Sequence, residues 1–159
     1  MLQLRNSKEL ASLLKKALEI ERGFENMAQW EGYVQAKSDV FRNTLFTMIS
    51  ESEHHASMVT EMLDRLSTTV TDTPNLRQQL FDYSLKEESE VMRELARNEK
   101  LALDTYTNIR ESLKSSDTSA WLPPADREFM LEQLHELMLA ESEHVRLATK
   151  NIGKVERIR

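Results

Sequence analysis

The sequence contains no cysteine, and its 159 residues include only three glycines and three prolines. Without cysteine the chain cannot form disulfides, thiolate zinc sites or cysteine-ligated iron–sulfur clusters. The scarcity of glycine and proline argues against a β-sandwich or a β-barrel, whose many turns need these residues. No apolar run approaches the roughly 18 residues that span a bilayer, and the start MLQLRNSKEL is not a signal peptide. We therefore expect a cytoplasmic protein with no membrane partner.

The composition is that of a folded globular protein. Apolar residues make up 40% of the chain and charged residues 30%, proportions that differ from those of disordered chains. A chain of this length can bury its own core, so we expect one domain that spans residues 1–159. The formal net charge of −6 argues against a nucleic-acid partner, because nucleic-acid-binding surfaces are basic.

Apolar residues recur at steps of three and four through most of the chain, which is the spacing of amphipathic helices. Asn6 with Glu9 predicts the start of the first helix, and Gly153 predicts the end of the last one. The predicted helices cover about 7–32, the stretch from near Gln35 to Leu66, a stretch that includes 95–113, and about 126–153. Residues 67–75, STTVTDTPN, form a connector, and residues 76–86 either extend the third helix or form a short one. Four helices without a strand pattern predict an all-α four-helix bundle.

Two glutamates interrupt the apolar stripes of the first and third helices. Glu21 comes four residues after Ala17, and Glu99 lies between Leu95 and Ala102 at helical spacing. Residues three or four positions apart share a helix face, so both carboxylates are expected to point into the bundle. In the alternative interpretation, each glutamate lies at the border of its stripe and reaches solvent.

The tetrapeptide Glu-Ser-Glu-His occurs twice, in the second and the fourth helix. Its first and last residues are Glu51 with His54 and Glu141 with His144, and each pair shares one helix face. We expect both pairs to face inward and His55 to lie behind His54 or in solvent. Counted from the turns at 1.5 Å per residue, the four acids and two histidines lie at one level of the bundle. The alternative is two solvated pairs on charged helices.

A cluster of four carboxylates needs compensating positive charge. Burying them without it would cost several kcal/mol for each ion, and no lysine or arginine occupies the same stripes. Two divalent or trivalent metal ions would remove that cost. Carboxylate and imidazole donors without thiolate suit iron or manganese and, less selectively, zinc. The sequence therefore predicts a site for two metal ions, with iron as the first choice.

Four segments resemble the ferritin-like superfamily, in particular rubrerythrin-type domains: ALEIERGF (17–24), SESEHHA (50–56), RNEKLALDTY (97–106) and AESEHVR (140–146). The resemblance in pattern covers roughly residues 8–152. It implies a ferritin-like bundle with a long crossover between the second and third helices. It also implies six metal ligands, namely Glu21, Glu51, His54, Glu99, Glu141 and His144. By the resemblance Glu51 and Glu141 bridge two iron ions, the other two glutamates each bind one, and Tyr106 matches a tyrosine beside the ligands.

The resemblance implies a non-haem di-iron protein that reacts with peroxide or dioxygen, as a peroxidase or a ferroxidase. Rubrerythrins also carry a rubredoxin domain with four cysteines and a further carboxylate three residues from the third-helix ligand. This chain has no cysteine, and Ala96 and Ala102 occupy those positions. Electrons would therefore come from a separate donor protein.

Other functions stay open beside this one. They are iron binding or storage in an oligomer, hydroxylation of a substrate, and a metal-free helical interaction module. We expect a homodimer. The connection between the second and third helices either crosses over within one chain or exchanges helix pairs between two chains.

Overall fold

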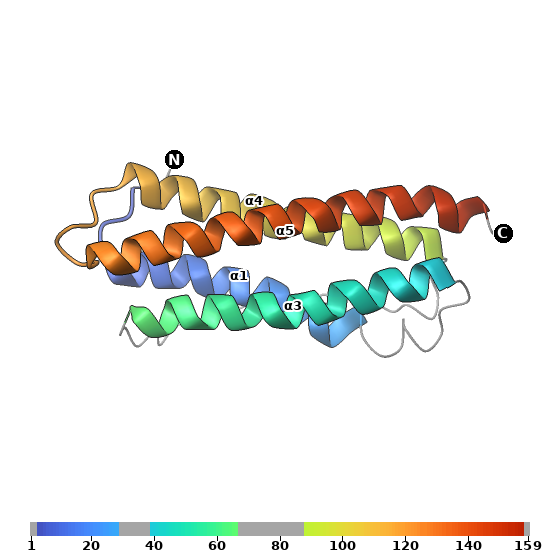
Figure 1. The fold of residues 1–159 in the computed structure, drawn as a ribbon, viewed down its shortest axis with the longest axis horizontal. Coiled ribbons are helices and arrows are strands. Elements are labelled where there is room, and N and C mark those ends of the chain that lie inside the picture. The colour runs from blue at the N-terminus through green and yellow to red at the C-terminus, as the bar shows by residue number, and fades with distance from the viewer. Residues whose placement is uncertain (1–2, 29–38, 67–87, 158–159) are drawn as a thin grey trace.

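The computed structural model of the protein describes residues 3–28, 39–66 and 88–157 (Figure 1). These ranges form four helices and no strand: α1 (Ser7–Ala28), α3 (Asp39–Arg65), α4 (Glu88–Ser115) and α5 (Pro124–Arg157). The predicted all-α class is therefore confirmed. The predicted end of the first helix near residue 32 and both alternatives for residues 76–86 lie outside the described residues. None of the described helices combines the length and the apolar composition that crossing a membrane requires.

The four helices lie side by side along one long axis (Figure 1). α1 packs against α3 and α4, and α5 packs against the same two helices, so the order around the bundle is α1, α3, α5, α4. α1 and α5 run in one direction, and α3 and α4 run in the other. The end of α3 and the start of α4 therefore lie at opposite ends of the bundle (Figure 1). The connecting residues 67–87 lie outside the described residues, so both the crossover and the exchange of helices remain predictions.

The start of α1 agrees with its sequence signal, whereas both ends of α5 differ from the predicted ones. The side-chain oxygen of Asn6 accepts a hydrogen bond from the backbone N–H of Glu9 at 3.0 Å, which confirms the predicted cap of α1. The last helix begins at Pro124, two residues before the predicted start, because proline is tolerated in the first helical turn. The predicted end at Gly153 is wrong, since α5 continues to Arg157. One glycine inside a helix costs only about 1 kcal/mol relative to alanine, which need not end a long helix.

Arginines fix the helices against each other at the end of the bundle where α5 begins. The guanidinium of Arg65 lies 3.6 Å from the ring centroid of Phe129 and 3.2 Å from a carboxylate oxygen of Asp126. These contacts join the last turn of α3 to the start of α5. Arg127 donates hydrogen bonds to the backbone carbonyl oxygens of Leu113 and Lys114, at 3.2 Å each. These carbonyl groups lie at the end of α4, where the helix itself provides no donors for them.

The helices pack through a seam of buried residues spaced alternately three and four apart, as in coiled coils. The positions are Leu10, Leu14, Ala17 and Glu21 in α1; Leu45, Met48, Ser52, His55, Val59 and Met62 in α3; Met92, Leu95, Glu99, Ala102, Tyr106, Ile109 and Leu113 in α4; and Met130, Leu134, Leu137, Glu141, His144 and Ala148 in α5. Apolar side chains fill most of this seam and provide the main stabilisation of the bundle. At one level, polar residues from all four helices replace them.

Candidate metal centre

The polar layer of the seam brings together carboxyl, imidazole and hydroxyl groups that are distant in the sequence. Each of its members is less than one-tenth exposed: Glu21 from α1, Ser52 and His55 from α3, Glu99 and Tyr106 from α4, and Glu141 and His144 from α5. We call these seven residues the polar cluster. Buried polar groups of this number require partners, and the contacts within the cluster provide them.

Glu141 lies at the centre of the polar cluster. Its Oε1 is 2.7 Å from Nδ1 of His55, and its Oε2 is 3.5 Å from Nδ1 of His144. The two imidazole rings stack with their centroids 5.4 Å apart and their planes inclined by 26°. One carboxylate therefore faces both imidazoles, with one oxygen toward each.

Each imidazole also has a carboxyl group of its own. Oε1 of Glu21 lies 3.5 Å from Nδ1 of His55, and Oε2 of Glu99 lies 3.1 Å from Nδ1 of His144. We call His55 with Glu21 the His55 half-site, and His144 with Glu99 the His144 half-site. Glu141 is the carboxylate that the two half-sites share, since it contacts both imidazoles.

Two hydroxyl groups orient the carboxyl group of Glu21. Tyr106 donates a hydrogen bond from its phenol oxygen to Oε1 of Glu21 at 2.8 Å. Ser52 donates to the other carboxylate oxygen, and its Oγ lies 3.3 Å from the backbone carbonyl oxygen of Glu21. Tyr106 thus lies beside the predicted ligand Glu21, which agrees with the position that the resemblance implied. Ser52 is not among the predicted site residues.

Burial governs the protonation of two carboxyl groups and of the tyrosine. It raises the pKa of Glu21, although the hydrogen bond to His55 acts in the opposite direction. It raises the pKa of Glu99 well above the ordinary value, and the hydrogen bond with Glu141 adds to that rise. Burial, together with the charge of Glu21, raises the pKa of Tyr106 well above its ordinary value. These groups favour their protonated forms more than exposed ones do.

Glu141 and the two histidines favour their charged forms instead. Burial alone would raise the pKa of Glu141, but hydrogen bonds from Glu99 and from both histidines outweigh it and lower that pKa. Burial alone would lower the pKa of His55, but hydrogen bonds to Glu141 and Glu21 raise it to about 9. Hydrogen bonds to Glu141 and Glu99 likewise overcome burial and raise the pKa of His144 to about 11. Protons therefore balance the negative charge of the cluster when no metal is bound.

Four of the six predicted ligands lie within the polar cluster, a fifth lies at its edge, and the sixth lies outside it. Glu21, Glu99, Glu141 and His144 all lie in the polar cluster. Glu51 lies at its edge, with its side chain 49% exposed and a carboxylate oxygen in contact with Nε2 of His144. The expectation that His54 faces inward is wrong, because His54 is exposed.

His55 occupies the place that the sequence analysis gave to His54. Along α3 the buried seam runs through Met48, Ser52, His55 and Val59, so His54 points away from the bundle. The two Glu-Ser-Glu-His copies thus differ in phase by one residue relative to their seams. The signal that identifies His55 is the alternation of three and four along the whole helix, not the tetrapeptide.

The donor set of the polar cluster fits a metal ion. Donor atoms of His55, Glu141 and His144 all lie within 4.8 Å of one another. The buried Oε2 of Glu141 lies 3.5 Å from Nδ1 of His144 and forms no hydrogen bond of good geometry with the described residues. Imidazole and carboxylate donors without thiolate suit iron, manganese or zinc. The cluster is therefore a group that could hold a metal.

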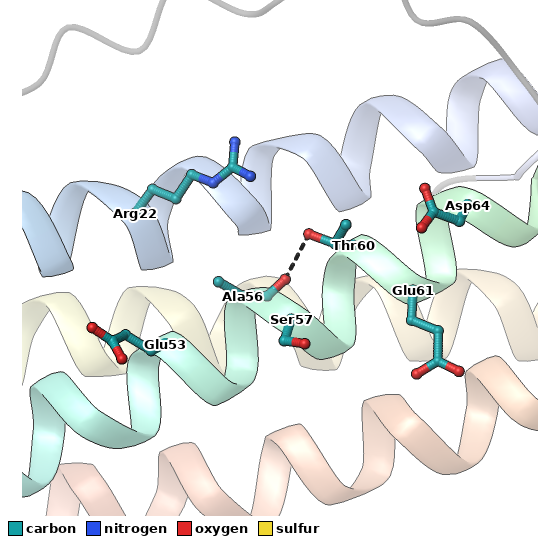
Figure 2. Close-up of a pocket in the computed structure, with 7 residues that line it drawn as sticks. All are labelled: Arg22, Glu53, Ala56, Ser57, Thr60, Glu61 and Asp64. Carbon is teal, nitrogen blue, oxygen red and sulfur yellow. Dashed lines mark hydrogen bonds between the residues drawn. The ribbon is translucent and has the colours of Figure 1, made fainter.

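A surface groove of about 510 Å³ runs along the outer side of α1 and α3 (Figure 2). Its lining consists of Arg22, Glu53, Ala56, Ser57, Thr60, Glu61 and Asp64. The three carboxylates are spread along the groove and do not converge on one point (Figure 2). The hydroxyl of Thr60 donates a hydrogen bond to the backbone carbonyl oxygen of Ala56 at 2.8 Å. The groove therefore lacks the convergent donors that the polar cluster has.

In comparisons with protein-family models, curated proteins and solved structures, nothing matches this chain.

Proposed function

We propose that this chain is a non-haem carboxylate protein of the ferritin-like, rubrerythrin type that binds two iron or manganese ions and reacts with peroxide or dioxygen. The position of Glu141 carries the proposal, because one carboxylate faces Nδ1 of two histidines that each have a second carboxyl group. A structural polar network would need no such pairing. The pairing is what a bridged pair of metal ions requires.

The proposed ligands follow from the half-sites. His55 and Glu21 would hold one ion, His144 and Glu99 would hold the other, and Glu141 would bridge them. The carboxyl groups and imidazoles must lose their protons to bind, so metal replaces the protons that balance the cluster. His55 replaces His54 in this set because it is the buried imidazole of α3.

Two iron ions held by these residues would supply two electrons for the reduction of an O–O bond. The residues of the chain exclude water, since every member of the polar cluster is buried. Tyr106 donates a hydrogen bond that holds Glu21 in place and keeps one of its oxygens oriented toward His55. Because the chain has no cysteine cluster to supply electrons, turnover as a peroxidase needs an external donor.

An anaerobic titration of metal-free protein with Fe(II), followed by addition of peroxide, tests the proposal. We expect saturation at two ions per chain and then a rapid rise of ferric absorption in the near ultraviolet. Glu141→Gln should lose the paired site, because an amide cannot bridge two cations. Glu143→Gln is the matched control, since Glu143 is exposed on the same helix and pairs with Arg146. Saturation below one ion, or equal binding by Glu141→Gln, contradicts the proposal.

One observation favours a second candidate, a metal-free helical module. Protons alone allow nearly all polar groups of the cluster to form hydrogen bonds with one another, so the bundle can fold without a metal. Melting with and without Mn(II) separates the two candidates. An ion at 100 times its dissociation constant stabilises the folded state by about 2.7 kcal/mol. At this chain length that shift is about 5–10 °C in Tm, whereas no shift supports the metal-free module.

A further inference from the structure

Both ring nitrogens of His144 contact carboxylates. Nδ1 faces the interior of the polar cluster, 3.1 Å from Oε2 of Glu99 and 3.5 Å from Oε2 of Glu141. Nε2 faces the opposite way and contacts Oε2 of Glu51. The imidazole of His144 therefore lies between the cluster and Glu51.

The geometry of an imidazole ring decides which carboxylates an ion on His144 can share. In a neutral imidazole one ring nitrogen has a lone pair and the other carries a proton, and the two directions diverge in the ring plane, so an ion on Nδ1 is out of reach of a group on Nε2. The Nδ1 edge faces two buried carboxyl groups, whereas the Nε2 edge faces Glu51, whose side chain is 49% exposed. Nδ1 is therefore the edge of His144 that is suited to a metal.

We propose that Glu51 is not a bridging ligand but a positioning residue, which accepts the Nε2–H hydrogen bond of His144 and keeps Nδ1 for the metal. A carboxylate behind a metal-binding histidine fixes its tautomer and ring orientation and makes it a stronger donor. The inference rests on the proposed function, and it changes the role that the resemblance implied for Glu51. Because Glu51 contacts the histidine of one half-site, we expect that removing its side chain weakens the binding of one of the two ions.

Zinc, which is diamagnetic and suits the same donors, is the probe for the test. Glu51→Gln retains a carbonyl oxygen that accepts the Nε2–H hydrogen, and Glu51→Ala removes it. We expect Glu51→Gln to bind two Zn(II) ions nearly as tightly as the parent chain. Glu51→Ala should still bind two at saturation, but with one dissociation constant raised about 10- to 100-fold. The matched control is Glu53→Gln, which removes an exposed charge of the same tetrapeptide and leaves both constants unchanged.

Nitrogen-15 spectra of labelled histidine provide a readout that loss of structure alone would not change. In the zinc-loaded chain, His144 should keep its proton on Nε2 and show the chemical shift of a metal-bound Nδ1. Circular dichroism shows whether each variant folds. If Glu51→Ala does not fold, Glu51→Gln still tests the proposal.

Loss of one zinc ion from Glu51→Gln, or zinc on Nε2 of His144, overturns the role of Glu51 and leaves the paired site in place. Absence of zinc, iron and manganese binding in the parent chain overturns the proposed function and this inference together. The two failures are thereby distinguished.

Discussion

Raising the pH should destabilise the metal-free protein, in contrast to bundles whose buried charges are carboxylates alone. The polar cluster holds protons that the unfolded chain releases near neutral pH. The folded pKa is about 9 for His55 and about 11 for His144, and unfolded histidine titrates near 6.5. Groups with a raised folded pKa stabilise the fold fully below their unfolded pKa and lose this contribution as the pH rises through the folded value.

The size of the effect follows from the number of protons. Between about pH 6.5 and 9 the two histidines bind up to two more protons in the folded state than in the unfolded state. Each extra proton changes the free energy of unfolding by about 1.4 kcal/mol per pH unit. The raised pKa values of Glu21 and Glu99 act with the same sign, from their unfolded pKa of about 4.3 up to their folded values. The pKa of Glu141 is lowered, so this residue stabilises the fold at pH values above its unfolded pKa. It loses that stabilisation only as the pH falls, so it does not offset the loss of stability between pH 6.5 and 9.

Urea unfolding of EDTA-treated protein at several pH values between 6.5 and 9 measures this slope. We expect a loss of several kcal/mol across the range, a large part of the 5–15 kcal/mol that typical domains possess. Glu141→Gln should flatten the slope, because Glu141 forms hydrogen bonds that raise the pKa of both histidines. His135→Gln, which changes an exposed histidine of the same helix, should leave it unchanged. A free energy of unfolding that is constant or rises over this range would refute the reasoning.

Three further predictions concern single residues. His55→Ala should abolish one of two metal-binding equivalents in the Fe(II) titration, while His54→Ala should retain both, and the reverse result would restore the tetrapeptide assignment. Tyr106→Phe removes a hydrogen bond to Glu21 without changing the packing, and it should lower the stability of the metal-free chain by about 1–2 kcal/mol in urea unfolding. Asn6→Ala removes the cap of α1 and should cost about 1 kcal/mol in the same assay, whereas Asn6→Asp should cost far less.

The helical architecture could be predicted from the sequence, because the spacing of apolar residues within a segment indicates whether that segment is a helix. The cap at Asn6 and the apolar spacing place the start of α1, the end of α3 and the start of α5 within two residues, whereas the end of α5 lies four residues beyond Gly153. Glycine often lies just after the end of a helix, which is why Gly153 predicts an end there. In α5 the helix simply continues through it, since the cost of one glycine is small.

The candidate site could be predicted where a residue shares the phase of a long apolar series. Glu21, Glu99, Glu141 and His144 are such residues, and all four are buried. The prediction for His54 is wrong because the two copies of the tetrapeptide have different orientations relative to their seams. Each residue turns a helix by about 100°, so a shift of one position moves a side chain from the interior to the surface. Contacts between helices, such as that of Glu51 with His144, are not encoded in any single helix.

The shift in phase between the two tetrapeptides also has a consequence for redox balance. Ser52 lies three residues before His55 in the seam, where Glu141 lies three residues before His144, so a serine replaces what would be a second shared carboxylate. In the proposed centre, three buried carboxylates nearly neutralise two divalent ions but leave two trivalent ions with excess positive charge. Excess charge in a buried site is costly. In such a centre the serine would favour the reduced pair and would raise its reduction potential above that of a bundle with glutamate in both positions.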